Sequence, residues 1–308
     1  MSKNIIKKDA IIIGAGPAGI SCGLILKENN IDFAILDGST PGGKINIAPR
    51  VDNYPGFTEV PGPDLAFAFF ERLINAGISI EGENVLSLTK DEDTFILDCD
   101  YNIYHAKTVL IATGTEERKL GIAKEDEMFG KGLSYCAICD GHFFKDKNAV
   151  IIGGGNSALK EAIYLAGLVK KLYIVHRRNE FRGSKKNLDE VLSFPNVEIV
   201  TPYVPKEILG EDHVTGLVIE NRETHELRTL DIEGMFPLVG QNPNTQFVKI
   251  PGVLDDYKAV PANKKLHTKV EGLFAAGDVL PRVIKQIYLS EFDGKVAAKE
   301  MINFLKNK

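Results

Sequence analysis

The feature that most constrains the fold is a glycine-rich segment that occurs twice. The sequence AIIIGAGPAG at residues 10–19 aligns with AVIIGGGNSA at residues 149–158, an offset of 139 residues. Each copy begins as a short apolar strand, turns at glycine and enters a helical pattern, Ile20 to Lys27 in one and Leu159 to Leu168 in the other. This order is the βαβ unit that binds dinucleotides, and two copies in register are a much stronger signal than one.

The glycines and their neighbours form the first set of candidate cofactor-binding residues. The first glycine allows a tight turn, the second lets the backbone approach a pyrophosphate, and the third position permits close packing of helix on strand. Unpaired N–H groups at the start of the helix then bind the anion. A glycine turn without a ligand is the alternative for either copy. The residues concerned are Gly14, Gly16, Pro17, Ala18 and Gly19 in the first copy and Gly153, Gly155, Asn156, Ser157 and Ala158 in the second.

The two copies differ where their second strands end, because the same offset aligns Asp37 with His176. An acidic residue there accepts hydrogen bonds from ribose hydroxyls and repels a 2′-phosphate, so the first site is expected to bind FAD or NAD. The second site carries Arg177, Arg178 and Arg182, which can pair with a 2′-phosphate and indicate NADPH. The alternative is a solvated basic surface, to which four lysines contribute: Lys170, Lys171, Lys185 and Lys186.

Two further strand-to-glycine segments bring the chain back to the first unit. They are VLIATG at 109–114, with Ala112, Thr113 and Gly114, and EGLFAAGD at 271–278, with Gly277 and Asp278. Polar, turn-rich stretches at 113–116 and 240–244 are interpreted as two crossings between domains.

The sequence therefore predicts an α/β fold of two Rossmann-like dinucleotide-binding domains, for FAD and NAD(P), with the second inserted into the first. The first domain, for FAD or NAD, would be discontinuous, 1–115 and 242–308. The second domain, expected to bind NADPH, would be 116–241. Helical spacing of apolar residues over 293–306 predicts a docked C-terminal helix.

A C-x-x-C pair, Cys136 and Cys139, lies between the two fingerprints. Such a pair can close a disulfide across one turn, and a dinucleotide fold can bring electrons to it. A structural zinc site would need a second ligand pair, which Cys22, Cys99 and His142 do not supply, so no metal is expected. Two inert thiols are the other alternative. The combination favours a relay from reduced nucleotide through a flavin to a protein disulfide.

Asp140 directly follows the second cysteine and is the candidate acid/base. Dithiol–disulfide exchange needs a group that manages the proton of the leaving thiolate. His142 is the reserve candidate, and a capping or loop-holding role is the alternative for Asp140. Cys22 and Cys99 lie in an apolar helix face and an alternating strand, where packing roles are expected.

The length and composition of the chain limit the number of domains, the kinds of partner and the expected compartment. A chain of 308 residues corresponds to about two domains of roughly 150 residues. A net charge of −5 argues against nucleic acid or an anionic membrane as the main partner. No apolar run approaches the ~20 residues of a membrane span, and the N-terminal segment is expected to form a strand and turn rather than a signal peptide. Four cysteines with one catalytic pair fit a reducing cytoplasm.

With these motifs the chain closely resembles a low-molecular-weight, bacterial-type thioredoxin reductase, class II of the pyridine nucleotide-disulfide oxidoreductases. The likeness runs essentially end to end. It rests on both fingerprints, on CAICD at 136–140 and HRRNEFR at 176–182, and on shorter segments: Gly42 and Gly43, DNYPG at 52–56 with Asn53, ATG at 112–114, and Gly277 and Asp278.

The resemblance implies a thioredoxin-disulfide reductase that uses NADPH, a homodimer with FAD in the discontinuous domain and NADPH in the inserted one. Cys139 would face the flavin, and Cys136 would exchange with thioredoxin. Asp278 would contact the ribityl-phosphate region of the flavin and Gln286 would approach its ring system. The chain departs from the family's usual pattern at four positions: Lys44, Leu289, Glu291 and Phe292.

Other functions use the same motifs. A related flavin-dependent reductase could serve a peroxiredoxin or a glutaredoxin-like acceptor. A relative of ferredoxin–NADP reductase is a further alternative, against which the C-x-x-C pair argues. A nucleotide-binding redox sensor would bind NADPH without turning over any disulfide. NADPH oxidation measured with and without a thioredoxin discriminates among these hypotheses.

Overall fold

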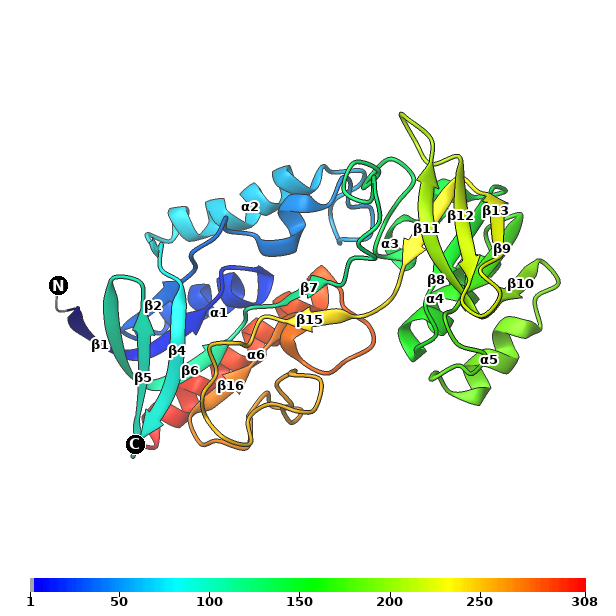
Figure 1. The fold of residues 1–308 in the computed structure, drawn as a ribbon. Helices are drawn as coiled ribbons and strands as arrows, with labels where there is room; N and C mark the ends of the chain where they lie inside the picture. Colours follow the sequence, from blue (N-terminus) through cyan, green and yellow to red (C-terminus); the bar gives the residue numbers. More distant parts are fainter. Residues whose placement is uncertain (1–2) are drawn as a thin grey trace. The chain divides into compact units, whose positions relative to one another are not determined.

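The computed structural model describes residues 3–308. The chain divides into two compact units. The first unit comprises the residues up to Glu116 together with those from Asn242 onward, and the second comprises Glu117–Gln241. In Figure 1 the blue and red ends of the colour scale belong to the first unit, and the green-to-yellow segment forms the second. The two crossings pair with each other as a two-stranded sheet of β7 (Thr115–Glu117) and β15 (Gln241–Pro243).

The first unit is built on a seven-stranded sheet in the order β3-β2-β1-β6-β5-β4, with β16 also paired to β6. Strands β1, β2, β3, β6 and β16 are parallel, whereas β4, β5 and β6 form an antiparallel meander. The apolar end of β1 is buried, as is usual for a strand inside a parallel sheet of an α/β fold. The bounds are β1 Asn4–Ile13, β2 Phe33–Leu36, β3 Ile80–Glu81, β4 Val85–Asp91, β5 Thr94–Cys99, β6 Asn102–Ile111 and β16 Leu273–Ala275.

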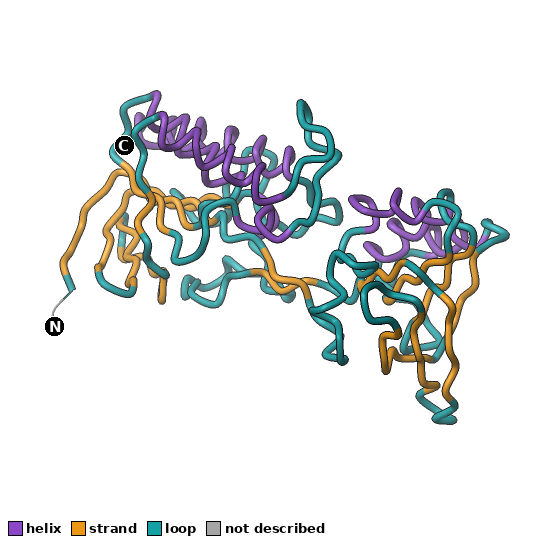
Figure 2. Tube along the Cα trace, turned by 90° about the horizontal axis from the view of Figure 1, so that it is seen from above, coloured by secondary structure: helices purple, strands orange, loops and turns teal. Residues whose placement is uncertain are grey.

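Helices α1 (Pro17–Glu28) and α6 (Ile287–Lys306) pack on this sheet, and α2 (Gly62–Asn75) packs against α1. Figure 2 shows the helices of each unit gathered on one side of that unit's strands. Helix α6 crosses α1 at van der Waals distance, since a Cβ on Gly294 would lie 2.0 Å from the carbonyl oxygen of Ala18. Short 3₁₀ turns lie at Gly43–Ile47 and Gly277–Val279.

Helix α6 begins six residues before the position that apolar spacing predicts. Its first turns expose Tyr288 and Phe292 instead of burying them. Because these large apolar side chains do not face the core, the periodicity that reveals a docked helix is lost over this stretch.

The second unit repeats the plan with a four-stranded parallel sheet in the order β10-β9-β8-β14. An antiparallel sheet of β11, β12 and β13 packs on one face, and α4 packs on the other. The bounds are α3 Ala137–Asp140, β8 Asn148–Ile152, α4 Asn156–Ala166, β9 Lys171–Val175, α5 Lys185–Leu192, β10 Val197–Val200, β11 Tyr203–Leu209, β12 Gly216–Asn221, β13 Leu227–Asp231 and β14 Gly234–Pro237, with a 3₁₀ turn at Gly141–Phe144.

Strand β8 shows how sequence alternation builds both layers of this unit. Val150 and Ile152 point into the core shared with the three-stranded sheet, whereas Ala149 and Ile151 point toward α4. Successive side chains on a strand face opposite sides, so a continuous apolar run can serve two cores. The α/β fold predicted from the sequence is confirmed. No helix within residues 3–308 has the length and apolar character needed to cross a bilayer.

Candidate active site

The first fingerprint forms a backbone cradle at the start of α1. Gly14 has a φ of 102°, and a Cβ there would lie 2.6 Å from the carbonyl oxygen of Ala112, beyond the end of β6. A Cβ on Gly19 would lie 1.9 Å from the carbonyl oxygen of Gly14. Gly16 differs, because no atom of the described residues lies within 4 Å of its missing side chain. The turn is therefore tight on the protein side and open where a pyrophosphate would approach.

The second fingerprint has the same geometry on other partners. A Cβ on Gly153 would lie 2.4 Å from the carbonyl oxygen of Leu238, beyond the end of β14. Within residues 3–308, nothing lies within 4 Å of a Cβ on Gly155. No side chain caps α1 or α4, so the first amides of both helices are left for an anion. Pro17 and Ala18 begin α1, and Asn156 and Ser157 begin α4.

The two strand ends differ in structure as well as in sequence. Asp37 accepts a hydrogen bond from the amide of Ala15 at 2.6 Å and another from the amide of Ser39 at 2.8 Å. His176 is buried under Gly154, where a Cβ would lie 2.5 Å from the imidazole. Burial holds the pKa of His176 below its usual value, so the ring is neutral at pH 7. Its Nε2 has no partner among the described residues, which fits a polar ligand at this site.

The arginine-rich loop folds back over the second fingerprint. The amides of Arg182 and Gly183 both donate to the carbonyl oxygen of Gly154, at 2.9 and 3.0 Å. Within residues 3–308, no carboxylate forms an ion pair with Arg177, Arg178 or Arg182, and all three side chains are exposed. The loop thus presents uncompensated positive charge beside the nucleotide cradle, which suits a phosphate.

Arg222 joins this loop from the turn between β12 and β13. Its Nη1 donates to the carbonyl oxygen of Arg177 at 3.1 Å. Sequence reasoning missed Arg222 because it lies far from the fingerprint along the chain, and a single arginine in a hairpin turn carries no signal of its own.

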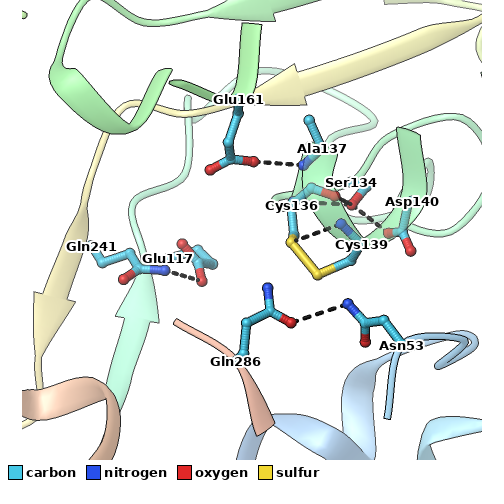
Figure 3. The surroundings of a disulfide bond; sticks show 10 residues. All are labelled: Asn53, Glu117, Ser134, Cys136, Ala137, Cys139, Asp140, Glu161, Gln241 and Gln286. Atoms are coloured by element: carbon cyan, nitrogen blue, oxygen red, sulfur yellow. Dashed lines mark hydrogen bonds between the residues drawn. A yellow bond between two sulfur atoms is a disulfide. The ribbon is translucent and has the colours of Figure 1, made fainter. Parts of the chain in front are cut away.

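Several of the flavin-site residues expected in the first unit lie together. The amide of Gly42 donates to the carbonyl oxygen of Ala15 at 2.7 Å, and a Cβ on Gly43 would lie 3.6 Å from the Cα of Gly16. The pair therefore borders the first fingerprint. Asn53 Nδ2 donates to Gln286 Oε1 at 3.0 Å, which ties the DNYPG loop to the start of α6 (Figure 3).

The two returning segments are also held within the first unit. Thr113 Oγ1 donates to the carbonyl oxygen of Asn244 at 2.6 Å, which fixes the turn that ends in Gly114. A Cβ on Gly277 would lie 3.3 Å from the Cβ of Ala18, so this segment reaches the start of α1. Asp278 accepts a hydrogen bond from Ser290 Oγ at 3.4 Å.

Buried Asp293 supports the same region and was not expected from the sequence. Its carboxylate accepts the amide of Gly277 at 3.0 Å and pairs with Arg282, while burial raises its pKa.

Two of the side chains that depart from the family's usual pattern also have defined partners. Lys44 Nζ donates to Thr115 Oγ1 at 2.9 Å. Glu291 accepts the hydroxyl of Tyr54 at 2.6 Å, so its carboxylate tethers the DNYPG loop.

The two cysteines form a disulfide at the start of α3, with Cα atoms 5.3 Å apart (Figure 3). Cys136 is the N-cap residue, and its Sγ accepts the amide of Cys139 at 3.2 Å. The pair is therefore a dithiol–disulfide couple mounted on one short helical turn. Cys22 and Cys99 are free and buried, as expected for packing residues, and burial raises the pKa of Cys99 to about 12.

Asp140 is held beside the disulfide by a residue that the sequence did not single out. Ser134 Oγ donates to Asp140 Oδ2 at 2.5 Å and accepts the amide of Cys136 at 3.1 Å. The carboxylate of Asp140 is thereby fixed to the turn that carries the cysteines. The imidazole of His142 contacts the ring of Phe143, with ring centroids 3.9 Å apart and the planes tilted by 44°.

A second carboxylate, Glu161, reaches the same turn from α4. Its Oε2 accepts the amide of Ala137 at 2.7 Å (Figure 3). Burial raises the pKa of Glu161 to about 7, and the hydrogen bonds from the amides of Ala137 and Ile138 oppose this increase. Among residues 3–308, no group of three or more histidine, cysteine or acidic side chains is arranged to hold a metal ion.

Two dinucleotide cradles and a disulfide on one chain define an oxidoreductase that exchanges electrons between a nucleotide and a dithiol. Residues 8–294 match the family described as pyridine nucleotide-disulphide oxidoreductase, and the chain belongs to this family. Membership implies a flavin and a pyridine nucleotide, which the two open cradles fit.

The chain is similar to known proteins over nearly its whole length. It is 41% identical over 299 residues to a thioredoxin reductase of Mycoplasma pneumoniae, covering 96% of this chain and 95% of that protein. It is 37% identical to a thioredoxin reductase of Borreliella burgdorferi, covering 97% and 92%. The crystal structure of thioredoxin reductase from Streptococcus pyogenes is similar with a TM-score of 0.91 at 35% identity, covering 98% of this chain and 99% of that one.

Proposed function

We propose that the chain is an NADPH-dependent flavoenzyme that reduces the disulfide of thioredoxin. The observation that carries the proposal is the Cys136–Cys139 disulfide on α3, anchored by Glu161 to the helix that starts at the second fingerprint. The disulfide and the second nucleotide cradle are thus joined through one helix, α4. Full-length similarity to proteins named thioredoxin reductase supports thioredoxin as the acceptor.

The cofactor assignment follows from the two strand ends. FAD would lie in the first unit, with its pyrophosphate at Gly16 and the α1 amides and its adenosine ribose at Asp37. NADPH would lie in the second unit, with its pyrophosphate at Gly155. Its 2′-phosphate would lie at the arginine-rich loop, which carries Arg177, Arg178 and Arg182. When bound, the flavin supplies transfer of two electrons between a hydride donor and a disulfide.

Further flavin contacts are proposed for the segments that border the first cradle. They are Gly42, Gly43, Asn53, Ala112, Thr113, Gly114, Gly277, Asp278 and Gln286. Their support is that the structure brings Gly43 to Gly16 and Gly277 to Ala18, and joins Asn53 to Gln286.

The dithiol steps can be written with the residues of the chain. In the reduced enzyme the Cys136 thiolate attacks the disulfide of thioredoxin, forming a mixed disulfide and releasing one thioredoxin sulfur as a thiolate. Asp140 takes the proton of the Cys139 thiol and passes it to that sulfur. The Cys139 thiolate then attacks Cys136, which re-forms the enzyme disulfide and releases the second sulfur of thioredoxin as a thiolate that takes a proton from water. The Ser134 hydroxyl orients the Asp140 carboxylate throughout.

We propose a homodimer that works in the cytoplasm without nucleic acid or membrane partners. The free thiols of Cys22 and Cys99 fit a reducing compartment, and the resemblance to the family supports the dimer.

The test uses the full chain with FAD and a panel of disulfide acceptors. Wild-type protein should oxidise NADPH only when thioredoxin is present. Cys136→Ser and Cys139→Ser should each lower this rate by at least about a thousandfold, because covalent exchange then stops. Cys99→Ala removes a buried thiol with no proposed role and is the matched control. Turnover with a peroxiredoxin or glutaredoxin-like acceptor and none with thioredoxin would reassign the substrate. NADPH binding without any turnover would indicate a sensor.

The two cysteines should also trap different species. Cys139→Ser should accumulate a mixed disulfide between Cys136 and thioredoxin, seen by non-reducing electrophoresis and peptide mass spectrometry. Trapping through Cys139 in the Cys136→Ser protein, with none in the other variant, would reverse the assigned roles.

A further inference from the structure

The amides at the start of α3 are shared unequally between a sulfur and a carboxylate. Cys136 Sγ accepts only the amide of Cys139, at 3.2 Å. The amide of Ala137 donates to Glu161 at 2.7 Å, and the amide of Ile138 also donates to this carboxylate. A cysteine at a helix N-terminus ordinarily becomes more acidic because such amides stabilise its thiolate. Here two of the amides are already occupied by another anion.

Glu161 has no cationic partner in the part of the chain that the structure describes. Of the neighbouring ionisable groups, the Glu117 carboxylate on β7 acts on it and raises its pKa further, beyond the effect of burial. Asp140 on α3 accepts a hydrogen bond from Ser134, and the ring of His142 contacts Phe143. Lys160 and Tyr164 on its own helix form no ion pair or hydrogen bond with it in residues 3–308. Among the described residues, the carboxylate of Glu161 is therefore held chiefly by the backbone amides of the turn that carries the two cysteines.

We propose that Glu161 is a positioning residue of the dithiol, whose carboxylate fixes the amides of the cysteine turn and thereby sets the proton affinity of the cysteine sulfurs. The inference deepens the proposed thioredoxin reductase function, on which it rests. Nothing in the pattern of the fingerprint or the C-x-x-C motif points to this residue, which is separated from Ala137 by 24 positions.

The ionisation of Glu161 is coupled to that of the cysteine sulfurs because both groups become negatively charged. Reduction breaks the Cys136–Cys139 bond with two electrons, supplied by the reduced flavin of the proposed reaction, and leaves two sulfurs that bind up to two protons. An ionised Glu161 disfavours a thiolate beside it, so the sulfurs keep their protons. A neutral Glu161 removes this repulsion, and one sulfur then remains a thiolate at lower pH. By reciprocity, formation of a thiolate favours uptake of a proton by Glu161.

The central experiment measures iodoacetamide alkylation of the dithiothreitol-reduced full-length flavoprotein from pH 5 to 10, with each cysteine quantified by mass spectrometry. Glu161→Gln keeps an acceptor oxygen and removes the charge. We expect wild type to show a titration step near pH 7 that is absent from the variant. At pH 8 the variant should be alkylated roughly three to ten times faster, which corresponds to a thiol pKa lower by about half to one unit.

Two further variants make the outcome decisive. Glu233→Gln changes an exposed carboxylate of the same unit, paired with Lys147, and should leave the profile unchanged. Glu161→Ala removes both the charge and the acceptor. If Glu161 were only a structural anchor, Glu161→Gln would keep the wild-type profile while Glu161→Ala changed it, and the proposal would be overturned. The assay contains neither nucleotide nor thioredoxin. A protein that does not reduce thioredoxin could still show the predicted alkylation profile, so the two hypotheses are tested separately.

Stability gives an independent measurement on the oxidised protein, which has no titrating active-site thiol. The pKa of Glu161 is about 7 in the folded protein, above its usual 4.5, so the folded state retains a proton that the unfolded chain releases. This contribution to stability is complete below about pH 4.5 and is lost as the pH rises through about 7. The Tm of Glu161→Gln minus that of wild type should therefore increase between pH 4.5 and pH 8. A constant difference would contradict the burial of an ionisable carboxyl against the turn that carries the cysteines.

Discussion

The two dinucleotide units share a backbone and differ in what the backbone carries. Gly14 lies against the carbonyl of Ala112 and Gly153 against that of Leu238, and the second glycine of each fingerprint is open. At the end of the second strand, however, one unit has Asp37 bonded to two amides and the other has a buried, neutral His176. From this comparison we expect the glycine turn to determine where a dinucleotide lies, and the strand end and its loop to determine which dinucleotide binds.

The helices that follow the fingerprints are also used differently. Helix α1 is covered by α6, with Gly294 against the carbonyl of Ala18. Helix α4 instead holds the dithiol turn through Glu161. One copy of the motif is therefore built into a core, and the other supports a reactive group.

The largest predicted effect comes from the third position of the fingerprint. Gly19→Ala places a Cβ 1.9 Å from a backbone oxygen that cannot move without opening the turn. We expect loss of flavin retention and destabilisation of several kcal/mol, on the order of 3–5, as for a core clash. Absorbance at 450 nm and thermal unfolding measure both effects.

The matched change in the other copy is Ala158→Gly. It removes one methyl and adds backbone freedom in α4, so it should cost only about 1 kcal/mol and leave flavin content unchanged. Equal tolerance of both substitutions would show that the third positions are not packed differently.

The next effect concerns the arginine loop. Arg177→Ala or Arg178→Ala should weaken 2′,5′-ADP binding roughly tenfold to a hundredfold, since each charged hydrogen bond contributes about 1.5–3 kcal/mol. Affinity for 5′-AMP, which lacks the 2′-phosphate, should barely change. Calorimetry on the flavoprotein separates the two ligands, and equal losses for both would remove the 2′-phosphate from this loop.

Asp37→Asn tests the opposite unit. The carboxylate charge that favours ribose hydroxyls and repels a 2′-phosphate is removed, while the side chain keeps one oxygen for the amide of Ala15. We expect roughly tenfold faster loss of FAD on dialysis, from one weakened charged hydrogen bond. Binding of 2′,5′-ADP at the other unit should be unaffected, and a parallel loss there would indicate a general folding defect.

The smallest predicted effect is at Arg222, which contacts Arg177 only through its carbonyl oxygen. Arg222→Ala should weaken 2′,5′-ADP binding roughly twofold to fivefold, because exposed charges contribute about 0.2–1 kcal/mol. Arg222→Lys retains the charge and should recover part of the loss. Unchanged affinity in the alanine variant would confine the phosphate site to the loop after His176.

Much of the fold was readable because its signals are local. The repeated glycine turns, the apolar strands around them and the C-x-x-C pair each occupy a few consecutive residues. Steric limits on backbone and helix packing force glycine or alanine at those positions, so the sequence must display them. The start of α6 was misplaced because its first turns expose apolar residues, which removes the period that marks a buried face.

The supporting residues of the site could not be read in the same way. Ser134, Asp293, Asn244 and Arg222 each act through one or two polar contacts, at sequence separations that follow no fixed pattern. A polar side chain that bonds one backbone amide has no required spacing, so nothing in the sequence distinguishes it from a solvated surface residue.

The sequence by itself determined two α/β dinucleotide-type units with a C-x-x-C pair between them, and it predicts opposed cofactor preferences for Asp37 and the arginine-rich loop. Each follows from covalent neighbours, since strand, turn, helix and C-x-x-C are short-range patterns. Only the tertiary structure decided that Glu161 would reach back from α4 to the amides of α3. It placed a carboxylate with a pKa of about 7 against the amide of Ala137, next to Cys136. Burial and proximity exist only once the two helices are packed, and they change the proton affinity of a side chain whose identity alone gives no indication of it.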